Sequence, residues 1–246
     1  MLPIIQIILP SYGVCAGIGL IAAVILFLFR KRSVGLDINK TKQMMIAAVI
    51  GLVIGSRLVF VLTMIPNIIA DFSWQRLFGV ILMGGFVFYG GLLGAILGIY
   101  IYCKCKKLDM QPIFNAITPC FPLFHCFGRI GCFMAGCCYG IPGSFGVPMA
   151  FDPNTVRCPV QLVEAICCFV IFIVLIVVEK KKEGAPLLAV YLLSYAVVRF
   201  LLEFLRGDTV RGIWGFLSTS QWISLAIAAA VIITAVRKKR SFNKST

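Results

Sequence analysis

Long stretches without a charged side chain dominate this sequence. Four of them contain no Asp, Glu, Lys or Arg: residues 1–29, 77–103, 110–128 and 212–236. An α-helix needs about 20 predominantly apolar residues to cross the hydrocarbon core of a bilayer, so each stretch can be a span. Three further apolar segments are interrupted by only one or two charges: residues 44–64, 160–178 and 186–204. The sequence therefore predicts an all-α, polytopic membrane protein with seven transmembrane helices.

The amino-acid composition excludes several other classes of protein. The chain has 246 residues, of which 61% are hydrophobic and 13% are charged. A soluble domain carries about 25% charged residues, so a cytosolic enzyme is excluded, as are a disordered chain and a secreted disulfide scaffold. The formal net charge of +14 on so hydrophobic a chain indicates basic residues gathered on one side of a bilayer. We expect no nucleic-acid partner.

Most basic residues lie in four clusters that predict the orientation of the chain. Sixteen of the 23 Lys and Arg residues follow the first, third, fifth and seventh predicted spans, within residues 30–42, 104–107, 180–182 and 237–244. With seven spans, all four clusters lie on one side of the bilayer, which the positive-inside rule makes cytoplasmic. The N-terminus is then outside and the C-terminus is cytoplasmic.

The seven remaining basic residues are all arginines in the predicted spans or outer loops: Arg57, Arg76, Arg129, Arg157, Arg199, Arg206 and Arg211. A charge inside a span usually faces a cavity or a partner, and a guanidinium group can bind a phosphate through two parallel hydrogen bonds. Two interpretations remain. The arginines pair with Glu164 and Glu203 to hold helices together, or they receive an anionic, phosphorylated group in a membrane cavity. The second interpretation accounts for more of the seven.

Glycine and proline positions predict two local features. Glycines spaced four residues apart predict close helix packing: Gly51 and Gly55 in one span, and Gly90, Gly94 and Gly98 in the next. Residues 137–159 contain four prolines and three glycines, so we expect an irregular outer loop there. Such a loop is a natural place for a lid or for contact with an acceptor.

Eleven cysteines raise the question of a metal or redox site. The chain has no C-x-x-C pair and its single histidine is His125, so the spacing predicts no metal site. Six cysteines lie within residues 120–158. Cys137, Cys138 and Cys158 would face an oxidising outer side, which leaves a membrane thiol–disulfide oxidoreductase as an alternative. A structural role, with one disulfide in the outer loop, is the simpler interpretation.

Residues 128–140 read G-R-I-G-C-F-M-A-G-C-C-Y-G. This segment resembles the signature of the prolipoprotein diacylglyceryl transferase family, G-R-x-G-N-F-x-N-G-E followed by a glycine. Six other segments resemble family motifs in the family's order, and they begin at Tyr12-Gly13, Gly55, Gly84, Pro159, Tyr195 and Leu217. The later ones include P-x-Q-x-x-E-A at residues 159–165, Y-x-x-x-R with E-F-x-R at residues 195–206, and L-S-x-x-Q at residues 217–221.

The resemblance implies a reaction and a location. Such enzymes move the diacylglyceryl group of phosphatidylglycerol to the thiol of the lipobox cysteine in the signal peptide of a preprolipoprotein, releasing glycerol phosphate. It implies a multi-pass protein of the bacterial cytoplasmic (inner) membrane, with residues 1–246 forming one transferase domain in the lipid bilayer and the active site toward the outer leaflet. It implies no cofactor.

Charge grows on the phosphate as it leaves, and preorganised arginines stabilise such charge. We expect Arg129 and Arg199 to do this, with Arg57 and Arg206 in support. The residues expected to bind the phospholipid are Tyr12, Arg57, Tyr195, Glu203, Arg206 and Gly140. Further motif positions are Cys132, Cys137, Gln161 and Glu164.

The chain departs from the family pattern at four positions. Residues 84–91 resemble the family's G-G-x-x-F-H-G-G motif, and Tyr89 replaces its histidine. In the signature, Cys132 and Ala135 replace two asparagines, and Cys137 replaces a glutamate. Tyrosine, with a pKa near 10, is a poorer general base than histidine. Either His125, four residues before Arg129 and on the same helix face, relays the proton, or Tyr89 only orients the lipid head group. The departures also leave open a diverged member with another acceptor or another lipid group.

Overall fold

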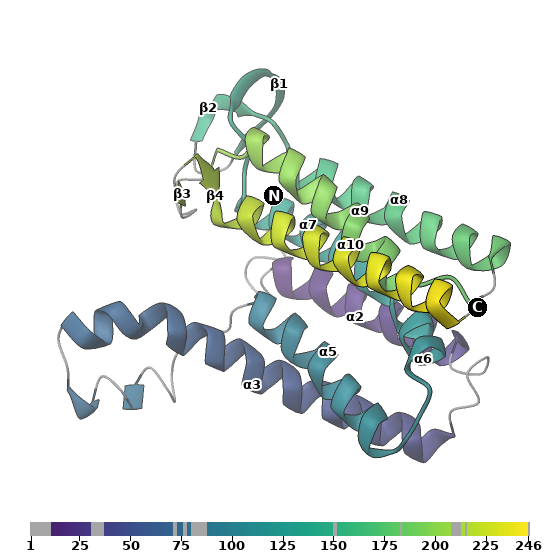
Figure 1. The fold of residues 1–246 in the computed structure, drawn as a ribbon. Helices are drawn as coiled ribbons and strands as arrows, with labels where there is room; N and C mark the ends of the chain where they lie inside the picture. Colours follow the sequence, from purple (N-terminus) through teal and green to yellow (C-terminus); the bar gives the residue numbers. More distant parts are fainter. Residues whose placement is uncertain are drawn as a thin grey trace. The chain divides into compact units, whose positions relative to one another are not determined.

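The computed structural model describes residues 11–30, 37–70, 73–75, 78–79, 88–149, 152–182, 184–207, 213–214 and 216–245, most of them in helices (Figure 1). They belong to two compact units. One unit comprises Met1–Ser33 with Gln111–Thr246, and the other comprises Val34–Met110.

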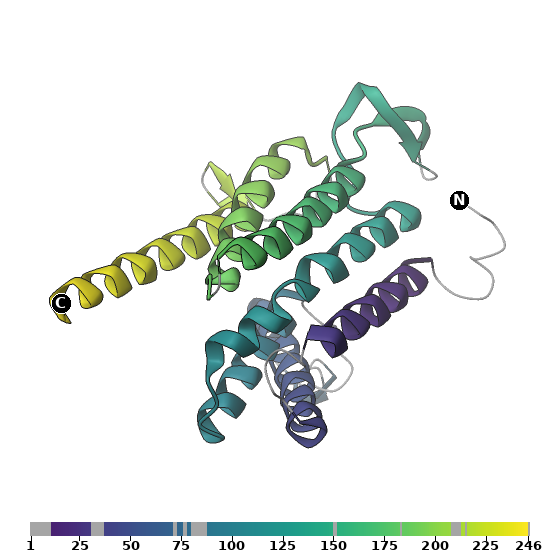
Figure 2. The same ribbon diagram turned by 90° about the vertical axis from the view of Figure 1, so that its right-hand side faces the viewer.

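Helices of the larger unit pack one against the next. These helices are α2 (Ser11–Arg30), α6 (Met110–Ile117), α7 (Cys120–Ala135), α8 (Val160–Lys181), α9 (Leu187–Leu202) and α10 (Thr219–Ser245). In turn, α2 contacts α7, α7 contacts α8, α8 contacts α9, and α9 contacts α10 (Figure 2). Helices suit these apolar sequences because a helix satisfies its backbone hydrogen bonds internally, as a bilayer requires.

Glycines join the two long helices of the smaller unit, α3 (Ile38–Ala70) and α5 (Phe88–Cys105). A Cβ atom added at Gly51 would meet the Gly94 carbonyl group, and one added at Gly55 would meet the Gly90 carbonyl group. The backbones therefore approach too closely for any larger residue, and the predicted close packing is confirmed. Asp37 caps α3, because its carboxylate accepts a hydrogen bond from the Lys40 backbone N–H at 2.7 Å.

Among the residues that the structure describes, five helices are long and apolar enough to cross a bilayer: Ser11–Arg30, Ile38–Leu62, Val160–Lys181, Leu187–Leu205 and Thr219–Arg237. Gly90–Cys105 is a shorter apolar helix. The span expected at residues 110–128 is not one continuous helix, because a turn at Thr118 and Pro119 separates α6 from α7. Pro119 has no backbone N–H to continue a helix and stands at the N-cap of α7.

The expected irregular loop at residues 137–159 contains a hairpin instead. Strands β1 (Pro142–Met149) and β2 (Asp152–Arg157) pair antiparallel, with register shifts in the ladder. A two-stranded ribbon has two free edges, so the proline in mid-strand β1 needs no ladder hydrogen bond there. A second, short pair, β3 (Ile213–Trp214) and β4 (Leu217–Ser218), precedes α10.

Apolar packing between α8 and α9 supports the polar cluster described below. Ile171 and Leu175 of α8 pack with Leu187 and Tyr191 of α9 and with Ala185. The ring of Tyr191 also stacks on Phe121 of α7, with centroids 5.9 Å apart.

Arg30, the last residue of α2, joins three helices at the other end. Its Nη2 lies 2.7 and 2.8 Å from the two carboxylate oxygens of Glu179 in α8. Its Nε and Nη2 also donate to the carbonyl groups of Ala116 and Asn115 in α6, each at 3.0 Å. Arg30 therefore forms a structural ion pair with Glu179, in addition to its predicted role in orienting the chain across the bilayer.

Candidate functional site

Glu164 is the centre of a buried polar cluster formed by α7, α8 and α9. It lies in the second turn of α8 and is 1% exposed. Its Oε1 accepts a hydrogen bond from the Tyr195 hydroxyl at 2.9 Å and lies 3.0 Å from Arg129 Nη2. Its Oε2 lies 4.0 Å from Arg199 Nη1. One carboxylate thus connects three helices. The residues that meet come from the signature on α7 and from the motifs on α8 and α9.

Arg199 extends the cluster toward α10. Its side chain is almost fully buried, and Nη2 lies 2.8 Å from Glu203 Oε2, one helical turn later. The same Nη2 donates a hydrogen bond to the hydroxyl of Ser220 in α10 at 3.1 Å. Arg199 therefore lies between two carboxylates, Glu164 and Glu203.

The ion pairs leave part of both guanidinium groups without hydrogen bonds. Arg129 Nε and Arg199 Nε and Nη1 are buried, and no acceptor among the described residues lies within hydrogen-bonding geometry of them. A buried donor left unsatisfied costs about 1–3 kcal/mol, and more when it is charged. The arginines therefore pair with the glutamates, as the first interpretation expects, and they also retain N–H donors that no described residue uses.

His125 and Tyr195 are packed against each other beside Glu164. Their ring centroids are 4.9 Å apart, and His125 Nε2 lies 3.9 Å from Glu164 Oε1. The four-residue spacing from His125 to Arg129 places both side chains toward the same carboxylate, as a shared helix face requires. His125 is thus part of the cluster around Glu164.

A Schellman motif ends α7 and fixes the turn that follows it. Gly136 has φ 72°, its N–H donates to the Phe133 carbonyl group, and the Cys137 N–H donates to the Cys132 carbonyl group, each at 3.1 Å. Gln161 of α8 reaches across, and its Nε2 donates to the Cys137 carbonyl group at 2.7 Å. The signature turn is therefore held by its own backbone and by the side chain of the next motif.

Gly140 joins the hairpin to the segment that carries Arg206. The two residues form an isolated antiparallel bridge, and the Gly140 N–H donates to the Cys158 carbonyl group at 3.1 Å. A Cβ atom added at Gly140 would meet that same carbonyl group. The structure thus gives Gly140 a packing role that positions Arg206, which is itself buried.

Ser218 and Gln221 form a capping box at the start of α10. The Ser218 N–H donates to Gln221 Oε1 at 2.9 Å, and the Gln221 N–H donates to Ser218 Oγ at 3.2 Å. The L-S-x-x-Q motif therefore begins the helix that supplies Ser220 to Arg199.

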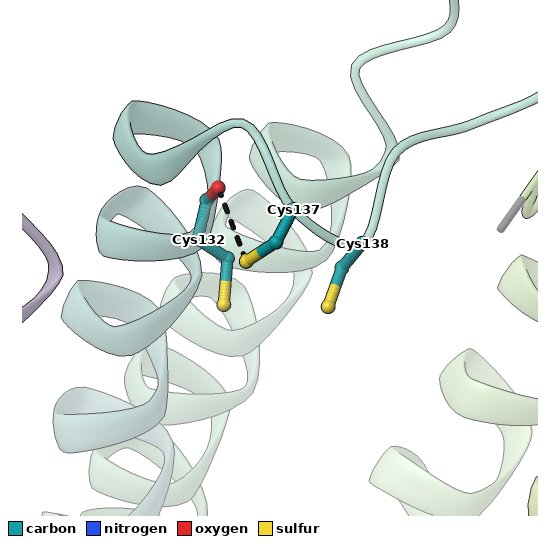
Figure 3. A group of neighbouring side chains, drawn as sticks. All are labelled: Cys132, Cys137 and Cys138. Carbon is teal, nitrogen blue, oxygen red and sulfur yellow. Dashed lines mark hydrogen bonds between the residues drawn. The ribbon is translucent and has the colours of Figure 1, made fainter. Parts of the chain in front are cut away.

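Three cysteines of the signature lie together at the end of α7. The sulfur atoms of Cys132, Cys137 and Cys138 all lie within 4.8 Å of one another (Figure 3). All eleven cysteines are free thiols, so the expected loop disulfide is absent. The neighbouring thiols of Cys132 and Cys137, together with the charges of Arg129 and Arg206, hold the pKa of the Cys138 thiol below its ordinary value.

Comparison with known proteins gives the family. The sequence model of the prolipoprotein diacylglyceryl transferases matches residues 1–237. The chain belongs to this family. The predicted membership is thereby confirmed, and with the apolar helices it identifies a multi-pass membrane transferase of lipoprotein biosynthesis.

Relatives of this diacylglyceryl transferase match most of its length. The phosphatidylglycerol–prolipoprotein diacylglyceryl transferase of Clostridium tetani is 35% identical over 222 residues, which cover 87% of each chain. Transferase 2 of Clostridium perfringens is 33% identical over 231 residues, which cover 91% of this chain and 88% of the relative. The enzyme of Cupriavidus metallidurans is 30% identical over 209 residues, or 80% and 76% of the two chains.

The structure brings together some of the expected site residues of this family member but not all. It gathers Arg129, His125, Glu164, Tyr195, Arg199 and Glu203 into one cluster. Tyr12 lies in the first turn of α2, next to Gly131 of α7, and is 47% exposed. Arg57 and Tyr89 belong to the smaller unit, and the side chain of Tyr89 lies outside the described residues, as do Arg76 and Arg211.

Two features of the candidate site were not predicted from the sequence. Ser220 is in no quoted motif position, although it lies inside the L-S-x-x-Q segment. The three-thiol cluster was missed because its C-x₄-C-C spacing matches no metal motif, and a Schellman turn was needed to fold Cys137 back toward Cys132.

Proposed function

We propose that this protein transfers the diacylglyceryl group of phosphatidylglycerol to the thiol of the lipobox cysteine of a preprolipoprotein, with release of glycerol phosphate. The family and the names of the relatives support this activity. In this chain, the main structural support for the activity is the buried pair Arg129 and Arg199. These two arginines lie beside Glu164 in apolar helices, and some of their N–H groups have no hydrogen-bond partner among the described residues.

We further propose that the chain forms one transferase domain in the bacterial cytoplasmic membrane. It crosses the bilayer seven times, with the N-terminus outside, and its basic clusters lie in the cytoplasm. The β1–β2 hairpin and the turn after α7 then lie on the outer side, because they are at the opposite ends of their helices from Arg30 and Lys180. This orientation places the signature turn toward the outer leaflet, where the lipid and the acceptor meet.

The reaction replaces a C–O bond by a C–S bond. The acceptor thiolate attacks the glyceryl carbon attached to the phosphate oxygen, and the electron pair of the broken bond leaves on that oxygen. Charge on the phosphate rises as the diester becomes a monoester. Arg129 Nε and Arg199 Nε and Nη1 are the donors proposed to bind it, and Glu164 and Glu203 hold these guanidinium groups in place.

The acceptor thiol must lose a proton, since the thiolate is the reactive form. His125 is the proposed relay, because it lies beside Tyr195 and Glu164. The Tyr195 hydroxyl donates a hydrogen bond to Glu164, and Tyr195 is therefore proposed to orient the cluster rather than to accept a proton.

The experiment that tests this proposal is lipid transfer by the purified full chain. Phosphatidylglycerol vesicles and a lipobox peptide are supplied, and both released glycerol phosphate and modified peptide are measured. Arg129→Lys keeps the charge near Glu164 but removes the Nε–H donor and the planar fork. Loss of one hydrogen-bond donor to a developing charge lowers kcat about 100–1000-fold, and we expect a loss of this size for Arg129→Lys.

Arg237→Ala is the matched control, because this arginine is exposed near the end of α10. The Arg237→Ala protein should transfer lipid at the rate of the parent protein. No glycerol phosphate from the intact protein would contradict the proposed activity, whereas full activity of Arg129→Lys would remove Arg129 from the phosphate site.

A diverged acceptor range is the second candidate. It is favoured by Cys132, Ala135 and Cys137, which stand where the family pattern has two asparagines and a glutamate. A panel of peptides that differ around the acceptor cysteine would distinguish the two candidates. Transfer only to peptides without a lipobox would support a diverged acceptor range.

A further inference from the structure

The three clustered thiols of Cys132, Cys137 and Cys138 are not used by the mechanism above. Cys132 lies in the last turn of α7, and the other two lie in the turn that follows. Figure 3 shows the three side chains converging from the helix end and the turn, with the Cys137 sulfur directed toward the Cys132 backbone oxygen at 3.6 Å. Three soft sulfur ligands in one place are a chemical feature that needs a function.

The backbone holds this cluster in a fixed arrangement. The Schellman motif sets the direction of Cys137 relative to Cys132, and Gln161 binds the Cys137 carbonyl group. Cys138 adopts φ 58°, a left-handed conformation that non-glycine residues rarely occupy. Such a conformation persists only where the surrounding structure requires it, and it is found most often at functional sites.

The sulfur separations suit a metal ion better than a disulfide. Zinc–thiolate bonds of about 2.3 Å at tetrahedral angles place sulfur atoms about 3.8 Å apart. The sulfur atoms here lie within 4.8 Å of one another, so a shift of about 1 Å would suffice. A disulfide would need a separation of about 2.0 Å and would leave the third thiol unused.

The charges around the cluster favour an anionic complex. Three thiolates and one divalent cation carry a net charge of −1. Arg129 lies three residues before Cys132 on α7, and Arg206 forms a backbone bridge with Gly140, two residues after Cys138. They would balance that charge in a setting with few other ions.

We infer that Cys132, Cys137 and Cys138 bind a thiophilic metal ion of the zinc class, and that its remaining coordination position takes the thiol of the acceptor. This inference rests on the proposed function. The described residues supply three ligands, and three protein ligands with one open position are typical of catalytic rather than structural zinc. Thiolate ligands also select such ions over magnesium and calcium.

The metal would supply the nucleophile of the transfer. Such an ion would lower the pKa of the acceptor thiol, whose proton would pass to water or to His125. The acceptor thiolate would then form the C–S bond, and the electron pair of the broken C–O bond would leave with glycerol phosphate. No oxidation state would change, and the thioether product would be a weaker ligand that can dissociate.

The site is accessible to such an acceptor. Cys137 is exposed, while Cys132 and Cys138 are partly buried. Arg129, which lies one turn before Cys132 on α7, reaches Glu164 at 3.0 Å. The metal and the proposed phosphate site are therefore on consecutive turns of one helix, as a reaction between a bound thiolate and a bound lipid requires.

The test is a titration of the purified full chain with Co²⁺ after removal of metal under reducing conditions. We expect one Co²⁺ per chain, with sulfur-to-cobalt charge-transfer absorption and the intense visible bands of tetrahedral Co²⁺. Zn²⁺ should displace it. Cys132→Ser, Cys137→Ser and Cys138→Ser should each weaken binding on the order of 100-fold, at or above the loss seen for outer-shell changes.

Cys105→Ser is the matched control, because this exposed thiol lies at the end of α5, in the other unit. It should leave the Co²⁺ spectrum unchanged. Thermal unfolding of the metal-free forms checks the fold, and we expect the serine variants to unfold at the temperature of the parent. A lipobox peptide should shift the Co²⁺ bands, and the same peptide with serine in place of its cysteine should not.

Three results would overturn the inference: no tetrahedral Co²⁺ complex, a complex that survives all three substitutions, or full lipid transfer by the metal-free protein. The last result would leave the proposed function intact, because glycerol phosphate would still be released. Conversely, a three-thiolate Co²⁺ complex in a protein that releases no glycerol phosphate would support the metal site and refute the transfer.

Discussion

Replacement of Glu164 by glutamine removes the charge that joins α7, α8 and α9 and changes little else. Glutamine has the same length, and its Oε1 can still accept the hydrogen bond of Tyr195, now 2.9 Å long. What is lost is the negative charge 3.0 Å from Arg129 and 4.0 Å from Arg199. The variant therefore isolates the electrostatic part of the cluster.

The expected loss of stability follows from these distances. A pair of unit charges about 4 Å apart is worth about 4 kcal/mol at an effective dielectric constant of 20. Removal of one partner of a buried ion pair costs roughly 3–5 kcal/mol, because the other charge stays buried. Arg199 keeps Glu203 at 2.8 Å, so most of the loss should come from Arg129. We expect Glu164→Gln to lower the free energy of unfolding by about 3–5 kcal/mol.

Unfolding in mixed micelles with increasing SDS, followed by circular dichroism, measures this change. The double variant Arg129→Gln with Glu164→Gln should recover about 0.5–3 kcal/mol relative to the sum of the two single variants. Glu179→Gln is a control for the loss of a charge on the same helix, at the pair with Arg30. A Glu164→Gln protein as stable as the parent, or a double variant that is simply additive, would refute the reasoning.

Three further substitutions test the supporting structure. Ser218→Ala removes half of the capping box and should lower the free energy of unfolding by about 1 kcal/mol, measured in the same SDS titration; no change would mean that the box does not stabilise α10. Gly140→Ala puts a Cβ atom against the Cys158 carbonyl group and should cost about 1–3 kcal/mol while lowering lipid transfer through Arg206; a fully active, stable variant would contradict the packing role. Arg30→Lys keeps the charge at Glu179 but loses the donors to α6, and we expect a loss of about 1–3 kcal/mol by thermal unfolding, whereas an unchanged midpoint would show that charge alone suffices.

Local rules explain which elements could be predicted from sequence. Charge-free stretches of about 20 residues and glycines at four-residue intervals act within one helix or one helix pair, and each predicted span overlaps a helix. The break between α6 and α7 was missed because hydropathy does not register proline, whose missing N–H acts on backbone hydrogen bonds. The hairpin at β1 and β2 was missed because the prolines and glycines of residues 137–159 favour an irregular loop, whereas the two neighbouring strands pair in a ladder with register shifts.

The membrane class, the family and the identity of the residues that carry charge or sulfur follow from hydropathy, composition and ordered motifs, which are properties of the chain. Which of those residues meet depends on the fold. Glu164, Arg129, Tyr195 and Arg199 come from three helices, so their distances depend on how the helices pack. Cys132 and Cys137 are five residues apart, yet their sulfur atoms approach only because a left-handed glycine turns the chain back on α7. Helix packing, which no single segment encodes, and one local turn together convert scattered polar residues into a site.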